Sequence, residues 1–349
     1  MIVEAIRRVV EGKSLGREEA FEVMDAIMSG QATDAQIAAF LTALRMKGET
    51  IEELIGFARV MREKVVPVRT RARVQTSLSG TDREMLVDTC GTGGDATGTF
   101  NVSTATAFVV AGAGIPVAKH GNRSVSSLCG SADVVEALGV RLDLAPERVG
   151  RCIDEVGIGF CYAPLLHKAM KFVMLARREI RIRTVFNILG PLTNPAHASA
   201  QVIGVYDGAL TEVMAHVLKE LGILRAFIVH GQDGLDEISN TGESRISELR
   251  EGQVRTYTVH PADFGMPCAT MADLRGGSAA DNAEIIRRLL EGEAGPKRDI
   301  VLLNAGAAIA AGGKAPGIAE GVALAEESIK SGAAREKLER LVAFCQGQG

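Results

Sequence analysis

The sequence predicts an α/β protein with a small N-terminal helical domain and a larger domain whose mainly parallel central sheet is flanked by helices. In the first 66 residues, apolar positions recur at the three- and four-residue spacing of amphipathic helices. From residue 85 onward, short apolar runs alternate with helical segments, which is typical of a covered parallel sheet. The length of 349 residues fits two domains.

The N-terminal block contains signals that begin and end short helices. Thr33 is suited to be an N-cap, and Thr50 with Glu53 forms a capping-box pattern before the next helix. Three glycines follow periodic segments at intervals of 18 residues, where a helix C-cap needs positive φ: Gly12, Gly30 and Gly48. We expect a helical domain over residues 1–70, and helices from about 163–185 are candidates to join it.

Residues 71–349 are predicted to form the α/β domain. Strands are expected near 85–90, 115–122, 201–207 and 225–231. Helices are expected near 103–113, 131–138, 210–221, 281–290, 299–311 and 318–331. Ligands of parallel sheets bind at the carboxyl ends of the strands, and the polar motifs of this chain follow those ends.

Composition and charge exclude several classes of protein. The charged residues, 39 Lys and Arg against 43 Asp and Glu, give a net charge of −4, which argues against a general nucleic-acid binder. The longest weakly polar run, 105–118, is 14 residues long and too short to span a bilayer, so no membrane association is expected. Six scattered cysteines without a Cys-x-x-Cys pair indicate reduced thiols and a cytoplasmic location.

The first of four polar motifs is GTGGD at 91–95, directly after a predicted strand. Glycines let the backbone approach a phosphate and direct several N–H groups toward it. A dinucleotide-binding loop is the less favoured interpretation, because the helix starts late and the next strand ends in Lys119 and His120 rather than an acid. A glycine-rich turn without function stays open.

Two further motifs follow the same logic. TFNVST at 99–104 opens a long apolar helix; capping alone explains any one of its polar residues, but several together also suit a bound anion. KHGNRSVSS at 119–127 follows the next strand and gathers two cations and three hydroxyl groups, with a solvated loop as the alternative. His120 by itself is more often a structural hydrogen-bonder than a base.

The fourth motif, DGLDE at 233–237, follows the strand at 225–231. Its neighbouring carboxylates repel each other unless a cation offsets their charge. Oxygen ligands without Cys or His favour Mg²⁺ over Zn²⁺. The motif therefore predicts a magnesium site, with an acidic surface turn as the alternative.

In this order the motifs resemble the anthranilate phosphoribosyltransferase family over nearly the whole chain, and the resemblance includes CGSADVVEALG at 129–139, FNILGPLTNP at 186–195 and DGLDEIS at 233–239. It implies a homodimer with the fold that pyrimidine nucleoside phosphorylases share. It also implies transfer of the phosphoribosyl group from 5-phosphoribosyl 1-diphosphate (PRPP) to the amino group of anthranilate. The products would be N-(5-phosphoribosyl)anthranilate and pyrophosphate, the pathway tryptophan biosynthesis, and the cofactor Mg²⁺.

The resemblance implies the site residues as well. PRPP would be bound by Gly91, Gly94, Asp95, Thr99, Asn101, Val102, Ser103, Thr104, Lys119, His120, Gly121, Asn122, Arg123, Ser124, Val125, Ser126, Ser127 and Ser131. Magnesium would be bound by Ser103, Asp236 and Glu237, and anthranilate by Gly91, Asn122, His167 and Arg177. The catalytic residues would be Lys119, His120 and Arg177.

The expected chemistry agrees with these residues. Cleavage of PRPP builds negative charge on the departing pyrophosphate, which Mg²⁺, Lys119 and helix N–H groups would neutralise. Arg177 suits the anthranilate carboxylate because a guanidinium binds it bidentately. On the anthranilate side the sequence departs from the family pattern at Lys168, at 174–176 and at Arg181, where the family more often has glycine.

Two other functions remain as alternatives. A nucleoside phosphorylase of the same fold would leave the motifs at 186–195 and 233–239 without a purpose; phosphate-dependent release of base from thymidine or uridine would identify it. A non-catalytic relative that binds nucleic acid is disfavoured by the net charge and by the Asp236–Glu237 pair. A salt-sensitive shift of labelled DNA would identify that relative.

Overall fold

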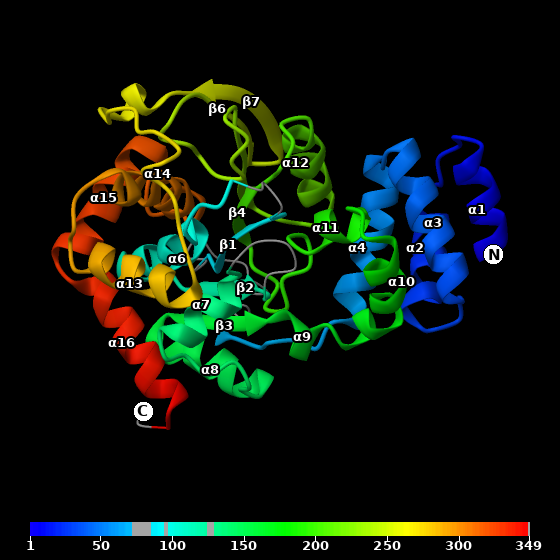
Figure 1. Ribbon diagram of the computed structural model, residues 1–349, viewed down its shortest axis with the longest axis horizontal. Coiled ribbons are helices and arrows are strands. Elements are labelled where there is room, and N and C mark those ends of the chain that lie inside the picture. The colour runs from blue at the N-terminus through cyan, green and yellow to red at the C-terminus, as the bar shows by residue number, and fades with distance from the viewer. Residues whose placement is uncertain (72–84, 94–96, 124–128, 348–349) are drawn as a thin grey trace.

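The computed structural model describes residues 1–71, 85–93, 97–123 and 129–347. In these ranges the chain forms a helical domain at one end and an α/β domain at the other (Figure 1). Six of the residues predicted to bind PRPP lie outside the described residues: Gly94, Asp95, Ser124, Val125, Ser126 and Ser127. None of the helices in the described ranges combines the length and the apolar character that a bilayer-spanning helix needs.

The α/β domain is built on one sheet, with seven strands in the described residues and the order β3-β2-β1-β4-β5-β6-β7. The strands are β1 (Val87–Gly91), β2 (Val117–Gly121), β3 (Ile158–Tyr162), β4 (Ala200–Gly204), β5 (Arg225–Gly231), β6 (Ser244–Arg250) and β7 (Gln253–Val259). Strands β1 to β5 are parallel, and β6 and β7 continue the sheet as an antiparallel hairpin. The prediction of a mainly parallel sheet is confirmed, although the sequence patterns identified neither β3 nor the β6–β7 hairpin.

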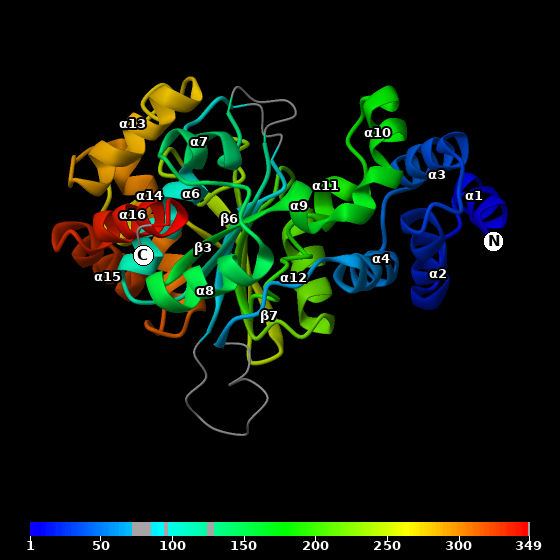
Figure 2. The ribbon, with the colours of Figure 1, turned by 90° about the horizontal axis from the view of Figure 1, so that it is seen from below.

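Helices cover both faces of the sheet, and Figure 2 shows α6 and α14 to α16 on one side with α11 and α12 on the other, toward the helical domain. The helices of this domain are α6 (Val102–Gly112), α7 (Ser131–Ala137), α8 (Pro146–Val156), α9 (Ala163–Leu166), α11 (Val185–Leu189), α12 (Leu210–Glu220), α13 (Ala279–Leu290), α14 (Pro296–Ala311), α15 (Ile318–Lys330) and α16 (Ala333–Cys345), with a short 3₁₀ turn, η2, at Pro261–Phe264. Helices α6 and α14 are buried nearly all round, which explains why their sequences lack a polar face.

The helical domain begins with α1 (Ile2–Val10), α2 (Arg17–Met28), α3 (Asp34–Lys47) and α4 (Ile51–Lys64). Thr33 caps α3 and Thr50 caps α4, each in a capping box with the residue three positions on, as predicted. The expected positive φ at the helix ends is confirmed at Gly12, Gly30 and Gly48. Capping residues therefore mark the starts of α3 and α4, and glycines follow the ends of α1, α2 and α3.

Two later segments pack against this bundle. The 3₁₀ turn η1 (Lys168–Phe172) lies against α2, and α10 (Met174–Ile180) lies against α3. Val173 and Ala176 are buried in the same apolar cluster as Phe40 and Leu41 of α3. These contacts support the inclusion of helices near 163–185 in the helical domain, while the boundaries 1–70 and 71–349 stay predictions.

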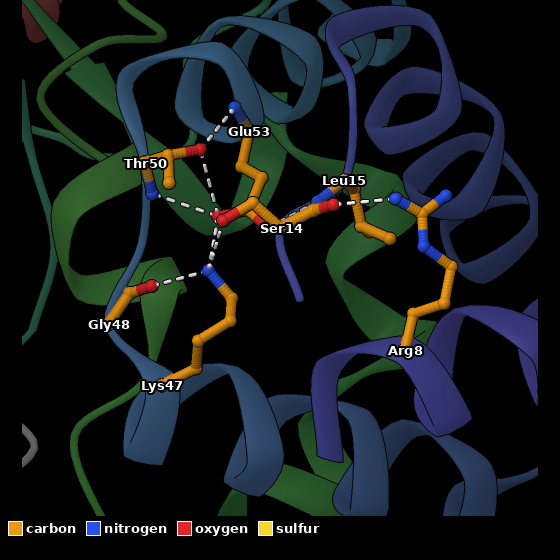
Figure 3. Close-up of polar contacts among 7 residues, drawn as sticks. All are labelled: Arg8, Ser14, Leu15, Lys47, Gly48, Thr50 and Glu53. Carbon is orange, nitrogen blue, oxygen red and sulfur yellow. Dashed lines mark hydrogen bonds and ion pairs between the residues drawn. The ribbon is translucent and has the colours of Figure 1, made fainter. Parts of the chain in front are cut away.

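Glu53 connects three parts of the helical domain (Figure 3). Its fully buried carboxylate accepts hydrogen bonds from the backbone N–H groups of Leu15 (2.9 Å) and Thr50 (2.8 Å) and from the Thr50 hydroxyl (3.0 Å). Lys47 at the end of α3 completes the set with an ion pair of 2.9 Å. Glu53, the third residue of the α4 capping box, thus also joins the α1–α2 connection to the end of α3. Because its carboxylate is buried, it needs each of these partners.

Replacement of Lys47 by Met should lower the free energy of unfolding by about 3 kcal/mol, because it leaves the buried Glu53 carboxylate without its cation. Urea denaturation followed by circular dichroism measures the change. Arg7→Met is the control, since it breaks an exposed ion pair with Glu4 and should cost less than about 1 kcal/mol. Equal losses for the two variants would contradict the role assigned to Lys47.

Candidate active site

The predicted motifs meet at one edge of the sheet. Four of the parallel strands, β1, β2, β4 and β5, end in a glycine: Gly91, Gly121, Gly204 and Gly231. Gly91 and Gly204 stand opposite each other in the parallel pairing of β1 with β4. Because these strands run in the same direction, the loops that follow them come together at their carboxyl ends.

Asp236 packs directly against two of these glycines. A Cβ atom on Gly91 would lie 2.5 Å from the Asp236 Oδ2, and one on Gly204 would overlap the carbonyl oxygen of Asp236. The Asp236 Oδ2 also accepts a hydrogen bond of 3.0 Å from the Gly93 backbone N–H, across 143 positions of sequence. The first and fourth motifs are therefore in direct contact.

The side chain of Lys119 reaches from β2 to β1 and also contacts the second motif, at 99–104. Its buried amine donates to the Thr89 carbonyl oxygen of β1 and, at 3.3 Å, to the Ser103 hydroxyl at the start of α6. The Thr89 hydroxyl in turn donates to the Ser103 carbonyl oxygen at 2.9 Å. One ammonium group thus holds two strands and a helix N-terminus together.

The strands β1 and β2 are joined mainly by side chains at this edge. Within the described residues, β1 and β2 pair at one position, Val87 opposite Val117, whereas β1 and β4 pair at five positions. Beyond Val117, the backbone N–H of His120 donates to the Asp88 carboxylate at 3.1 Å, and Lys119 bridges to Thr89. The resulting gap in the ladder places polar groups where a continuous sheet would have backbone hydrogen bonds.

Asp88 lies next to the predicted site residues Lys119 and His120, and the sequence motifs did not identify it. It is fully buried in β1, and burial raises the pKa of its carboxyl group, an effect that the nearby Lys119 opposes. Asn194, from the motif at 186–195, acts beside it by donating to the Ala118 carbonyl oxygen at 2.9 Å. The sequence signal for Asp88 is an acid inside a predicted buried strand, since a buried acid needs partners.

The start of α6 does not use its polar residues as ordinary caps. Asn101 is at the N-cap position without a side-chain cap; its amide nitrogen donates to the Cys129 carbonyl oxygen at 3.3 Å and its oxygen accepts from Asn282 at 3.0 Å. Val102 and Thr104 are buried, and Thr99 forms an isolated bridge with Arg275. The capping explanation is therefore wrong for the Asn101 side chain.

His120 and His167 form a buried pair of imidazoles. Their Nε2 atoms are 3.1 Å apart, so the N–H of one ring donates a hydrogen bond to the unprotonated Nε2 of the other. Burial is the main cause that lowers both pKa values, well below the ordinary range for His120 and to about 4 for His167. Both rings are neutral at pH 7, which suits hydrogen bonding better than delivery of a proton.

Arg177 belongs to α10, the helix that Figure 2 shows beside α3. Its guanidinium carbon lies over the Phe186 ring, 5.3 Å from the ring centre. Burial lowers the pKa of Arg177, and no ion pair in the described part of the chain involves it. Four residues on, Arg181 ends α10 with φ of 52°, the left-handed region that favours glycine. Glycine, which the resemblance leads us to expect at this position, would adopt this conformation without strain.

The described part of the 119–127 loop leads into α7. A Cβ atom on Gly121 would overlap the Ser131 hydroxyl, and the Asn122 carbonyl oxygen accepts from the backbone N–H of Ala132 at 3.1 Å. Arg123 forms ion pairs with Asp133 and Glu136 of α7, at 2.8 and 2.9 Å. The guanidinium of Arg123 is thus already engaged by two carboxylates on this helix.

Two groups of predicted site residues are connected by contacts among the described residues, and Arg177 lies outside both. The last residues of β1 connect the first group, which consists of Gly91, Ser103, Lys119 and Asp236. Glu237 lies close to Cys90 of the same strand, where its charge contributes to the raised pKa of the Cys90 thiol. His120 and His167 are connected to each other, and the backbone of His120 links them to β1 through Asp88. No hydrogen bond or ion pair among the described residues connects Arg177 to either group.

The donor set fits a hard cation such as Mg²⁺. Asp236 and Glu237 supply carboxylates and Ser103 a hydroxyl, all oxygen ligands. The glycine at 91 lets the Asp236 carboxylate reach the end of β1, where any side chain would clash with it. No group of three His, Cys, Asp or Glu side chains suited to a metal occurs in the described ranges. One or two carboxylates together with substrate phosphates are a common way for proteins to hold Mg²⁺.

Comparisons with known proteins support one family. Residues 83–335 match the glycosyl transferase family α/β domain and residues 3–65 match its helical bundle domain. The chain is 56% identical to an anthranilate phosphoribosyltransferase of Moorella thermoacetica over 346 residues, 99% of each chain. It is 57% identical to one from Geotalea uraniireducens, covering 98% of this chain and 99% of the relative.

Solved structures show the same similarity. Anthranilate phosphoribosyltransferase from Thermus thermophilus superposes with a TM-score of 0.90 at 45% identity, covering 98% of this chain and 99% of that one. The Saccharomyces cerevisiae enzyme in complex with PRPP and Mg has a TM-score of 0.87 at 26% identity, covering 99% and 98%. Both similarities extend over the helical and the α/β domains.

Replacement of His167 by Phe tests the neutral imidazole pair. Because the folded pKa of about 4 is below the ordinary 6.5, the unfolded chain binds a proton in this pH range that the folded chain excludes. The free energy of unfolding of the wild type should therefore decrease as the pH falls from 6.5 toward 4, and His167→Phe should reduce that decrease. Urea denaturation at both pH values measures it.

The buried Leu44 on α3 supplies the control for this experiment. Leu44→Ala removes no titratable group, so it should lower the free energy of unfolding by a similar amount at both pH values. If His167→Phe and the wild type lose stability equally between the two pH values, the His167 ring is not kept neutral by burial.

Proposed function

The chain belongs to the glycosyl transferase family whose helical-bundle and α/β domains it carries, and we propose that it performs the anthranilate phosphoribosyltransferase reaction at the carboxyl edge of its sheet. This reaction transfers the 5-phosphoribosyl group of PRPP to the amino group of anthranilate and releases pyrophosphate, a step of tryptophan biosynthesis. The observation that carries the proposal is the contact of Asp236 with Gly91 and Gly93, which joins the carboxylate motif to the glycine motif.

The phosphate groups of PRPP would bind where backbone N–H groups gather. Gly91 and Gly93 leave the first loop without side chains, and the N-terminus of α6 offers further N–H groups beside Ser103. Lys119 supplies a fixed positive charge at this place because Thr89 and Ser103 hold its amine. The other predicted PRPP residues, including the Asn122 and Ser131 region at the start of α7, would complete the binding site.

Magnesium would be held by Asp236, Glu237 and Ser103. Bound there, the ion neutralises the negative charge that develops on the pyrophosphate leaving group. The Gly93 N–H orients the Asp236 carboxylate toward the glycine loop. Magnesium in the yeast relative crystallised with PRPP supports the same cofactor in this chain.

Anthranilate would bind on the side of the helical domain. The guanidinium of Arg177 carries a positive charge whose burial is unfavourable without an anion, and a carboxylate is its planar complement. The neutral His120–His167 pair would border the aromatic ring, and Gly91 at the end of β1 and Asn122 just after β2 would complete the acceptor site. An aromatic amine is a competent nucleophile once it is oriented, so positioning replaces a strong base in this mechanism.

The three residues predicted to be catalytic would act through charge and orientation. Lys119 stabilises the leaving group, Arg177 orients the acceptor, and His120 contributes a neutral ring at the boundary between the two substrates. None of these roles requires a covalent intermediate. Preorganised charges in a partly buried site are sufficient to stabilise the separation of ribose and pyrophosphate.

We also propose that the protein forms a homodimer through the helical domain. The scattered cysteines support a cytoplasmic location for it. Large apolar side chains are exposed on packed neighbouring helices: Val3 and Val10 of α1 and Met46 of α3, which is 84% exposed. A second copy of the chain would cover them. Light scattering should then give twice the monomer mass of 36.9 kDa.

The direct test of the activity is the loss of anthranilate fluorescence when PRPP and Mg²⁺ are added to the purified protein. Consumption of both substrates with release of pyrophosphate supports the proposal. Binding of PRPP without turnover would overturn it, and phosphate-dependent release of base from thymidine or uridine would identify a nucleoside phosphorylase instead.

Asp236→Asn combined with Glu237→Gln should reduce kcat/KM at least about 100-fold, because it removes the negative charge that would hold magnesium at the leaving group. Steady-state rates at saturating Mg²⁺ measure this loss. Glu243→Gln, at an exposed carboxylate close by in sequence, is the control and should keep the wild-type rate. An unchanged rate in the double variant would remove both carboxylates from the site.

Arg177→Ala should raise the KM for anthranilate about tenfold or more and leave the KM for PRPP nearly unchanged. The reason is that Arg177 would contact the acceptor carboxylate and lies apart from the β1 edge. Arg178→Ala, at the exposed neighbouring position on α10, should change neither constant. Similar increases in both KM values would mean that Arg177 stabilises the fold rather than the acceptor.

A further inference from the structure

One polar side chain interrupts the buried surface of α14. Asn304 is 1% exposed, and the residues on either side of it in the helix, from Ile300 to Ala311, are buried and otherwise apolar or glycine. A buried carboxamide is unfavourable unless its donors and acceptor are paired. Its partners therefore indicate what it does.

Asn304 pairs with the backbone of a residue in the carboxylate motif. Its Oδ1 accepts a hydrogen bond of 2.9 Å from the Ile238 N–H, and its Nδ2 donates to the Ile238 carbonyl oxygen at 3.0 Å. The same nitrogen also donates to the Ile300 carbonyl oxygen one turn earlier, at 2.9 Å. A single side chain thus satisfies both backbone groups of Ile238, the residue directly after Asp236 and Glu237.

The other end of this motif is fixed separately. The Asp233 carboxylate accepts hydrogen bonds from the backbone N–H of Leu235, at 3.0 Å, and from the hydroxyl groups of Ser239 and Thr241. Asp233 is thereby used within the loop and closes it on itself. The loop as a unit still requires an attachment to the rest of the domain, and Asn304 provides one from α14.

The position of the loop is restricted from the opposite side as well. The carbonyl oxygen of Asp236 lies where a Cβ atom on Gly204 would be, so the loop contacts the end of β4 without spare space. The segment from Asp236 to Ile238 is held between β4 and α14. A small shift of Ile238 away from α14 would therefore move the carboxylates of Asp236 and Glu237.

We propose that Asn304 is a positioning residue for the magnesium site, which fixes the backbone at Ile238 so that Asp236 and Glu237 face the β1 edge. This inference rests on the proposed function, because it assumes that these two carboxylates hold the ion. Asn304 itself does not contact the metal or a substrate. It acts on the ligands through its two hydrogen bonds to the peptide units on either side of Ile238.

Asn304→Leu tests the proposal, since leucine fits an apolar helix and removes both hydrogen bonds to Ile238. The affinity for Mn²⁺ in the presence of PRPP, measured by electron paramagnetic resonance of the free ion, should fall about tenfold or more, as for partners that orient metal ligands. The Mg²⁺ concentration for half-maximal rate should rise in parallel. The KM for anthranilate should stay within about twofold of the wild type. Arg177, the residue proposed to bind anthranilate, lies on α10, and Asn304 forms its hydrogen bonds with Ile238 and Ile300 instead.

Ser328→Ala is the matched control for stability. Ser328 on α15 is also buried, and its hydroxyl donates to the Val109 carbonyl oxygen at 2.8 Å, so its loss removes a comparable buried hydrogen bond in the same helical layer. This variant should lose stability without any change in Mn²⁺ affinity. A general loosening of the domain would instead lower the Mn²⁺ affinity of both variants, which would overturn the proposal.

Asn304→Asp provides a second variant if the leucine variant does not fold. It has the same size and retains an acceptor for the Ile238 N–H but loses the donor to the Ile238 carbonyl, and it should also weaken Mn²⁺ binding. Wild-type Mn²⁺ affinity in a folded Asn304 variant would overturn the inference alone. Failure of the wild type to bind Mn²⁺ with PRPP would overturn the proposed function, and the inference with it.

Discussion

The close approach of Asp236 to Gly91 and Gly204 is the constraint on which the site depends. Any side chain at either glycine would occupy space that Asp236 fills, so the strand ends and the carboxylate loop are complementary in shape before any ligand is present. The hydrogen bond from the Gly93 N–H to Asp236 adds direction to this contact. The predicted phosphate-binding loop and the predicted metal ligands are thereby brought to the same place by packing of the polypeptide backbone.

Buried polar groups extend this arrangement through the α/β domain. Lys119, Asp88 and Asn304 each take the place of an apolar core residue, and each pairs with backbone groups of a neighbouring element. Such groups contribute little net stability but permit one arrangement of the elements that they join, since an unpaired buried polar group is costly. The domain uses them at the carboxyl edge of the sheet, where the orientation of side chains matters most for the proposed reaction.

Local sequence signals predicted the elements whose causes are local. The helix starts at Thr33 and Thr50 follow from capping by nearby residues, and the strands before the motifs follow from short apolar runs. The β6–β7 hairpin escaped prediction because β6 and β7 carry mixed polar patterns. The strand β3 is as short and as buried as the predicted strands, but none of the four polar motifs follows it to draw attention to it. Arg181 illustrates an intermediate case, in which the family pattern indicated glycine and the positive φ supplies the reason.

By itself, the sequence determined the fold class, the four polar motifs and their placement after strands, because periodicity and turn chemistry act over a few residues. Only the tertiary structure decided that His120 and His167 share a hydrogen bond, that Asn304 holds Ile238, and that Asp236 accepts from Gly93. These pairs are 47, 66 and 143 positions apart in sequence. Distance along the chain carries no information about such pairs, since the order of strands in the sheet and the packing of helices on it decide which side chains meet.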